Sequence, residues 1–180
     1  MNLKLFHCTS KEYYDTILGY GKLFSEKKAR KLKLITQSST GEIDRQYNRD
    51  RYVFLSHLPQ NYGDVVMRFS DEVLNLPECY VATAGDFLNF CDTPESIKYF
   101  NDSIIPGRKF KSYFNTLLKK LPNPDWFWGK KTGLKKFLSN ALIENMMGKP
   151  DNLRLYWSLF PEIMVKDELS LDYLINVIIK

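Results

Sequence analysis

The pattern of apolar and polar residues changes, near the start of the chain, from that of a strand to that of a helix. The short apolar run LKLFH at residues 3–7 is typical of a buried first strand. Thr9 and Glu12 then have the spacing of a capping box. Apolar residues follow at helical spacing: Tyr13, Tyr14, Ile17 and Leu18. We therefore expect a helix that begins at Thr9 and ends at Gly19 or Gly21.

Short apolar runs return after a polar, turn-rich segment at residues 36–51, which predicts a loop. YVFLSHL at residues 52–58 and DVVMRFS at residues 64–70 are separated by the turn-forming PQNYG. The two runs predict a hairpin or two adjacent strands. CYVATA at residues 79–84 predicts a third strand in this part of the chain.

The second half of the chain is expected to be helical first and extended afterwards. The patterns predict helices over Pro94–Asn101, Arg108–Leu121 and Thr132–Met147, with a loop at NPDWFWG because prolines interrupt any helix there. Runs rich in isoleucine and valine within residues 153–180 predict two further strands. A chain of 180 residues suits one domain, so we expect a single α+β domain over residues 1–180.

Composition narrows the class of protein. Apolar content is 44%, as in a folded globule, and no apolar run approaches the length of a membrane span. The first ten residues lack the features of a signal peptide, and three cysteines are an odd number for a disulfide framework. His7 and His57 are the only histidines, so we expect no metal site. Together these features favour a cytoplasmic protein that does not span a membrane.

Positive charge is concentrated in two stretches. Residues 22–33 carry +5 and residues 108–136 carry +8, so the rest of a chain with net charge +5 sums to −8. This asymmetry is typical of a face that binds a polyanion such as nucleic acid, and also of lysine-rich, solvated helix faces. The lysines that we consider candidates for binding nucleic acid are Lys109, Lys111, Lys130, Lys131 and Lys135.

Three segments carry a more specific pattern, and they occur in a fixed order. A strand ends in His-x-Thr within LFHCTS, an arginine-bearing loop leads into an aromatic strand in RQYNRDRYVFLS, and a late glutamate opens an apolar run in FPEIMVKDELSLDYLI. This ordered set resembles the ADP-ribosyltransferase superfamily, most closely the DarT-like toxins and phage-defence proteins that modify nucleic acids. The resemblance covers residues 3–21, 45–69 and 160–178, about a third of the chain.

The resemblance implies an ADP-ribosyltransferase-like split β-sheet core, with the lysine-rich helical middle as an insertion and NAD as co-substrate. Glu162 would stabilise the positive charge that develops when the bond between nicotinamide and ribose breaks. His7 would bind the adenosine ribose, the Cys8 backbone would receive the nicotinamide amide, and Thr9 would serve the cleft or the helix cap. By themselves, Glu162 also fits a plain strand-edge glutamate, and His7 a core histidine that bonds a backbone carbonyl.

The middle segment supplies the other candidates of the resemblance. Tyr52 or Tyr62 would stack on the nicotinamide ring, although Tyr52 also suits a core aromatic residue, and Ser56 ends the facing strand. An arginine between the first helix and the aromatic strand completes the site, and position favours Arg49 or Arg45 over Arg51, which abuts the strand.

One departure bears on the substrate. Enzymes of this superfamily that modify protein arginines carry a second acid two residues before the catalytic glutamate, and Phe160 stands at that place. The sequence therefore predicts an ADP-ribosyltransferase toxin that modifies RNA or DNA, in a toxin–antitoxin or phage-defence system with a neutralising partner. A transferase that acts on protein and a non-catalytic basic module that binds nucleic acid remain as alternatives.

Overall fold

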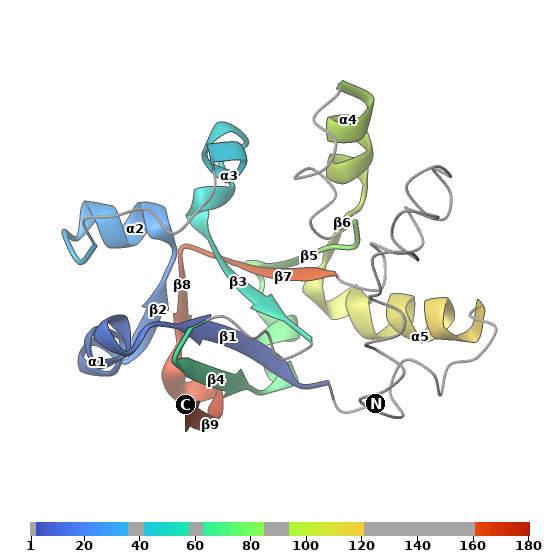
Figure 1. The fold of residues 1–180 in the computed structure, drawn as a ribbon. Coiled ribbons are helices and arrows are strands. Elements are labelled where there is room, and N and C mark those ends of the chain that lie inside the picture. Colours follow the sequence, from blue (N-terminus) through green and yellow to red (C-terminus); the bar gives the residue numbers. More distant parts are fainter. Residues whose placement is uncertain (1–2, 36–41, 58–62, 85–93, 121–160) are drawn as a thin grey trace, which may run out of the picture.

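The strand β1 (Leu5–Thr9) lies inside a seven-stranded antiparallel sheet, in the order β6-β5-β7-β3-β1-β4-β9. The other strands are β3 (Tyr52–Ser56), β4 (Val65–Phe69), β5 (Cys79–Ala82), β6 (Ile104–Pro106), β7 (Glu162–Lys166) and β9 (Leu174–Ile179). Our computed structural model describes residues 3–35, 42–57, 63–84, 94–120 and 161–180 (Figure 1). The fold is mixed α+β, as the sequence predicts.

The sheet is divided between β1 and β3. A single residue pair, Phe6 with Ser56, joins these two strands, whereas β1 pairs with β4 along its whole length. On the other side, β3 pairs with β7 along its whole length. The sheet therefore consists of two well-paired parts, β6-β5-β7-β3 and β1-β4-β9, connected by a short ladder.

The first strand and helix differ from the prediction at their junction. β1 continues through Thr9, and α1 (Lys11–Tyr20) is capped by Ser10, whose hydroxyl accepts a hydrogen bond from the Tyr13 backbone N–H at 3.4 Å. The prediction of Thr9 as the cap was wrong because Thr9 stays in the ladder, opposite Val65. Gly21 ends the helix, as one of the two predicted positions, with the positive φ of 64° that glycine adopts readily.

Between α1 and β3, the described residues form several short elements. β2 (Lys22–Phe24) is followed by α2 (Glu26–Lys31), and β2 pairs with β8 (Glu168–Ser170) in a separate two-stranded sheet. The predicted loop at residues 36–51 contains α3 (Glu42–Gln46) and the 3-10 turn η1 (Arg49–Arg51). The loop prediction was wrong there because these polar elements have no apolar stripe and are held by ion pairs instead.

The pairing of strands also differs from the simplest expectation. β3 and β4 are neither a hairpin nor adjacent, because β1 lies between them and pairs with both. The C-terminal segment forms three strands rather than two, β7, β8 and β9, with the 3-10 turn η5 (Leu171–Tyr173) before the last. Both differences come from pairing between segments far apart in the chain, which local apolar patterns do not specify.

The helices of the second half agree with the prediction where the structure describes them. α4 (Pro94–Asp102) and α5 (Phe110–Lys120) form, with the short strand β6 and the 3-10 turn η4 (Gly107–Lys109) between them. Another 3-10 turn, η2 (Asp71–Asn75), precedes β5. The predicted helix over Thr132–Met147 and the loop NPDWFWG lie outside the described residues.

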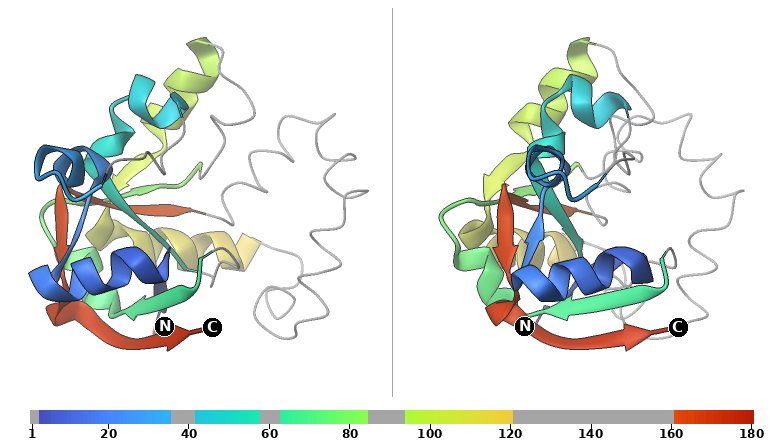
Figure 2. Two further views of the ribbon diagram at one scale, coloured as in Figure 1. Left: turned by 60° about the vertical axis from the view of Figure 1, so that its left-hand side comes forward. Right: turned by 90° about the vertical axis from the view of Figure 1, so that its left-hand side faces the viewer.

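The two faces of the sheet are covered by different helices. Alternation along β3 directs Val53 and Leu55 to one face, where the larger core includes Phe110 and Phe114 of α5. It directs Phe54 to the other face, where a smaller cluster includes residues of α4. Figure 2 shows α1 and α5 on one side of the sheet and α4 on the other. The residues discussed below lie beside the smaller cluster.

Gly107 is packed so tightly that a methyl group has no room. A Cβ there would lie 2.6 Å from the Leu74 carbonyl oxygen and 2.8 Å from the Cys79 Sγ. We expect Gly107→Ala to lower the free energy of unfolding by about 1–3 kcal/mol through overpacking. Gly19→Ala, at a position in α1 with nothing within 4 Å, is the control and should raise it by about 0.5–1 kcal/mol. Urea denaturation measures both, and equal effects would contradict the packing argument.

Candidate active site

Ser56 and Glu162 lie side by side where the sheet divides. Ser56 ends β3 opposite Glu162, the first residue of β7, and the same register continues to Phe6 on one side and Ala82 on the other. Directly opposed residues of antiparallel strands project on the same face, with Cβ atoms about 4.5–5.5 Å apart. Glu162 is thus held beside the Ser56 hydroxyl, at the edge of the division.

Arg49 brings a buried cation to this row. Its side chain is only 4% exposed, and its Nη2 donates to the Glu162 carboxylate while its Nη1 lies 3.2 Å from Asp44 Oδ1. The guanidinium also lies over two aromatic rings, 5.2 Å from the centroid of Phe54 and 4.8 Å from that of Phe100. The turn η1 places Arg49 here, directly before β3.

The two carboxylates of this cluster are less buried than the guanidinium that they contact. One guanidinium lies between two carboxylates, and the side chains of Asp44 and Glu162 remain 19% and 21% exposed. The low dielectric constant around the buried guanidinium and its contacts with the two aromatic rings strengthen the ion pairs. Because the carboxylates remain partly exposed, water or a ligand can still reach them. Glu162 is therefore fixed in position by Arg49 and stays accessible on the same face as Ser56.

His7 is fixed across the division between β1 and β3. Its Nδ1 lies 3.0 Å from the Phe54 carbonyl oxygen, which can only accept, so Nδ1 carries the hydrogen. Burial lowers the pKa of His7 below its usual value, and the bond to Phe54 opposes this only in part. His7 is therefore neutral at pH 7, with the lone pair on Nε2. The hydrogen bond from His7 to Phe54 lies beyond the end of the backbone ladder between β1 and β3.

The other predicted residues of the His-x-Thr element belong to β1. Cys8 is half-buried and pairs in register with Val66 of β4. Thr9 pairs with Val65, and its backbone is in close contact with Gly63. Neither residue is in the ladder between β1 and β3, which contains only Phe6 of this strand.

The predicted aromatic and alternative arginine residues lie away from Glu162. Tyr52 is four residues before Ser56 in β3, about 13 Å along the strand, and packs edge to face on Tyr80 with centroids 6.3 Å apart. Arg45 is paired with Glu26 at 4.0 Å, and the Arg51 guanidinium lies over the Tyr52 ring. The structure thus brings Arg49, and neither Arg45 nor Arg51, to Glu162; Tyr62 lies outside the described residues.

Three residues of the cluster are absent from the sequence prediction. Asp44 lies in a segment that was predicted to be a loop. Phe100 lies in a predicted helix in which the sequence indicates no functional residue. Phe54 was the easiest of the three to predict from the sequence, because it lies two residues before Ser56 and hence on the same face of the strand.

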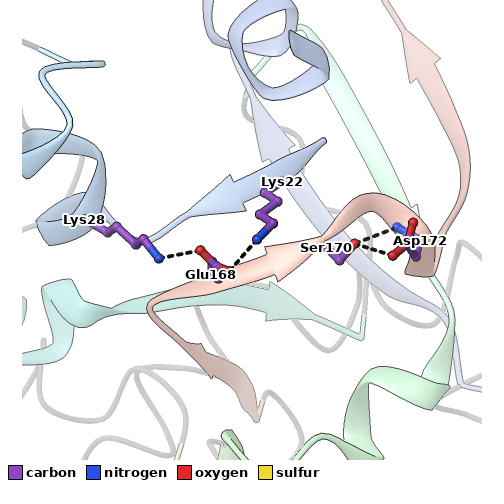
Figure 3. Close-up of polar contacts among 5 residues, drawn as sticks. All are labelled: Lys22, Lys28, Glu168, Ser170 and Asp172. Carbon is purple, nitrogen blue, oxygen red and sulfur yellow. Dashed lines mark hydrogen bonds and ion pairs between the residues drawn. The ribbon is translucent and has the colours of Figure 1, made fainter. Parts of the chain in front are cut away.

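Glu168 forms contacts that connect secondary-structure elements. Its carboxylate accepts hydrogen bonds from Lys22 at 2.7 Å and from Lys28 (Figure 3). These two bonds connect β8 to β2 and α2. These two lysines hold the pKa of Glu168 below its usual value. The same figure shows Ser170 and Asp172 hydrogen-bonded to each other at the start of η5. Glu168 is separate from the Arg49 cluster and provides a matched control for it.

Basic side chains are partly engaged in structural contacts. Lys109 is exposed on η4, whereas Lys111 forms an ion pair with Asp71 at 2.9 Å. The candidates Lys130, Lys131 and Lys135 lie outside the described residues. In the other basic stretch, Arg30 pairs with Glu26 at 2.7 Å, and Lys27 donates to Asn48.

Stability should fall in mild acid because of His57. This side chain is 3% exposed, and burial lowers its pKa from 6.5 to about 4. The unfolded chain therefore takes up a proton that the folded protein resists between these values. We expect the free energy of unfolding to fall by about 3 kcal/mol from this residue as pH drops from 6.5 to 4. Urea denaturation of His57→Gln should show a flatter pH dependence, and identical slopes would contradict the assignment.

Together the fold and the site define an α+β protein with a buried arginine–carboxylate cluster at the division of an antiparallel sheet. In comparisons with known proteins, no family model matches the chain, and neither does any curated protein or solved structure. Within the described ranges, no helix is long and apolar enough to span a membrane. In the same ranges, no group of three or more metal-ligating side chains is placed to hold an ion.

Proposed function

We propose that the protein is an NAD-dependent ADP-ribosyltransferase that modifies nucleic acid. The observation that carries this proposal is the ion pair between Arg49 and Glu162, which joins residues 113 positions apart. The pair lies beside Ser56 at the division of the sheet, and His7 bridges that division from β1. The residues come from the three segments on which the resemblance to ADP-ribosyltransferases rests, which supports a split-sheet core of that kind.

The residues present suit a nucleotide co-substrate. NAD supplies an ADP-ribosyl group, whose bond to the nicotinamide nitrogen breaks with both electrons leaving on nicotinamide. Glu162, held by Arg49, is placed to stabilise the positive charge that develops on the ribose, as carboxylates do in glycoside cleavage. It can also take the proton that the attacking amine or hydroxyl loses as the new bond to the ribose carbon forms. The neutral His7, with its Nε2 lone pair, is suited to accept from a ribose hydroxyl.

Nucleic acid is the favoured acceptor on two grounds. The chain has Phe160 where transferases that modify arginine have a second acid. Its positive charge is gathered in two stretches, and among the described residues Arg108 and Lys109 are exposed on η4. Cations so placed would contact phosphates, while the base or ribose to be modified reaches Glu162. Such an activity is toxic to an unprotected cell, so we include a neutralising partner in the proposal.

The proposal is tested with purified protein, NAD labelled in the adenylate, and separate pools of DNA, RNA and protein. We expect label on one nucleic acid with the wild type and with Glu168→Gln, and roughly a hundredfold less, or lower still, with Glu162→Gln. Label on protein alone would contradict the proposed nucleic-acid substrate and would support a transferase that acts on protein. No label in any pool, with nucleic-acid binding retained, would identify a binding module instead.

A further inference from the structure

The outer edge of β9 is open and apolar. Among the strands of the described residues, β9 is last in the sheet order and pairs with β4 alone. Three of its isoleucines are more than half exposed: Ile175 at 54%, Ile178 at 53% and Ile179 at 55%. An exposed apolar edge strand is a template for pairing with another chain, because its outward N–H and C=O groups lack partners.

The backbone direction of β9 can be read from its pairing with β4. The Lys180 N–H donates to the Asp64 carbonyl oxygen at 2.9 Å, so it points toward β4. Successive residues of an antiparallel strand point alternately to its two sides. The amides of Val177 and Ile179 therefore point outward, available to a further strand.

The opposite edge of the sheet is protected in the usual way. β6 is three residues long and includes Pro106, which has no N–H to offer. β9 has six residues, LINVII, without a charge or a proline. Of the two outer strands that the structure describes in this sheet, β9 alone therefore presents an open apolar edge, which favours a closed pair over a growing chain.

Charges at the two ends of β9 indicate which strand fits this edge. Asp172 precedes the strand and Lys180 follows it, and both are exposed. Within the described part of the chain, neither side chain has an ion-pair partner; Asp172 accepts from Ser170, and Lys180 donates to the Gly63 carbonyl oxygen. Each charge lies four residues from Asn176. A second β9 running antiparallel, with Asn176 opposite Asn176 of the other copy, places each Asp172 near the other copy's Lys180.

We propose that β9 pairs with β9 of a second copy of this chain, antiparallel about a two-fold axis at Asn176. The two sheets then continue into one another, and apolar residues oppose apolar residues across the axis, such as Leu174 and Ile178 of the other copy. The interface is isologous, the commonest arrangement in homodimers. Parallel pairing would bring like charges together at each end. This inference does not depend on the proposed function.

Sedimentation velocity of the full chain, over a roughly hundredfold range of concentration, tests the proposal. We expect a dimer that Ile178→Lys weakens by roughly thirtyfold or more, because a charge enters the centre of the interface. Leu18→Lys, at a similarly exposed position on α1, is the matched control and should leave the dimer unchanged. A wild type that stays monomeric, including one that instead binds a strand of another protein, would overturn the proposal.

The charge pair makes the register testable without altering the apolar edge. Asp172→Lys and Lys180→Asp should each weaken the dimer, since each places like charges in proximity across the axis. The double variant Asp172→Lys/Lys180→Asp should recover most of the affinity, because the pairs are restored with exchanged sign. A double variant as weak as the single ones, or a dimer indifferent to Ile178→Lys, would rule out this interface.

Discussion

Arg49→Met is expected to lower the free energy of unfolding by about 3 kcal/mol. The substitution keeps an unbranched apolar chain between the Phe54 and Phe100 rings and removes the cation that holds Asp44 and Glu162. The carboxylates of Asp44 and Glu162 then lose this cationic partner. Since both remain about one-fifth exposed, water relieves part of the cost, which places the loss at the lower end of the range for buried pairs. Urea denaturation at neutral pH measures it.

Two comparisons separate charge from packing in this prediction. Arg45→Met removes an arginine from the neighbouring helix, where its contact with Glu26 is 4.0 Å long and its side chain is 39% exposed, so the loss should be below about 1 kcal/mol. Arg49→Met/Glu162→Gln should be less destabilised than the sum of the two single variants, because either change alone already removes the ion pair between these two residues. Additive effects would show that Arg49 and Glu162 do not interact.

Glu162→Gln is expected to lower kcat for the proposed ADP-ribose transfer by roughly 10²–10³-fold, with little change in KM for NAD. The amide keeps the shape of the side chain and its place opposite Ser56, and it loses the negative charge that opposes the developing positive charge. Initial rates on the nucleic acid identified by labelling measure the effect.

Glu168→Gln is the matched control for this rate effect, because it makes the same chemical change at the start of β8. Its contacts with Lys22 and Lys28 are partly exposed, so it should cost at most about 1 kcal/mol of stability and leave kcat unchanged. Equal losses of activity in Glu162→Gln and Glu168→Gln would show that Glu162 has no special role.

Local signals in the sequence specify most elements but not their partners. The apolar runs around Phe6, Phe54 and Val66 predict three strands, and all three form. That β1 inserts between β3 and β4 depends on contacts across some fifty residues or more, for which a turn between two runs gives no information. The prediction that β3 and β4 form a hairpin or lie next to each other was therefore wrong.

The candidate site was predictable to the extent that its residues stand in strands. Glu162 and Ser56 could be proposed because each stands at the end of an apolar run. Asp44 could not, because the five-residue helix that carries it has a single apolar residue, Ile43, and is held by ion pairs rather than by an apolar stripe. The choice of Arg49 among three nearby arginines likewise required the turn η1, which directs this one side chain toward β7.

The place of β7 in the sheet has a consequence for the order of events during synthesis. β7 lies between β5 and β3, which are both made earlier, so these strands have no connection through the sheet until residues 162–166 leave the ribosome. Contacts of such long range form late and slowly. Glu162, the ion-pair partner of Arg49, is synthesised 113 residues after it. The site on which the proposed activity depends is therefore assembled only after residues 162–166 have been synthesised.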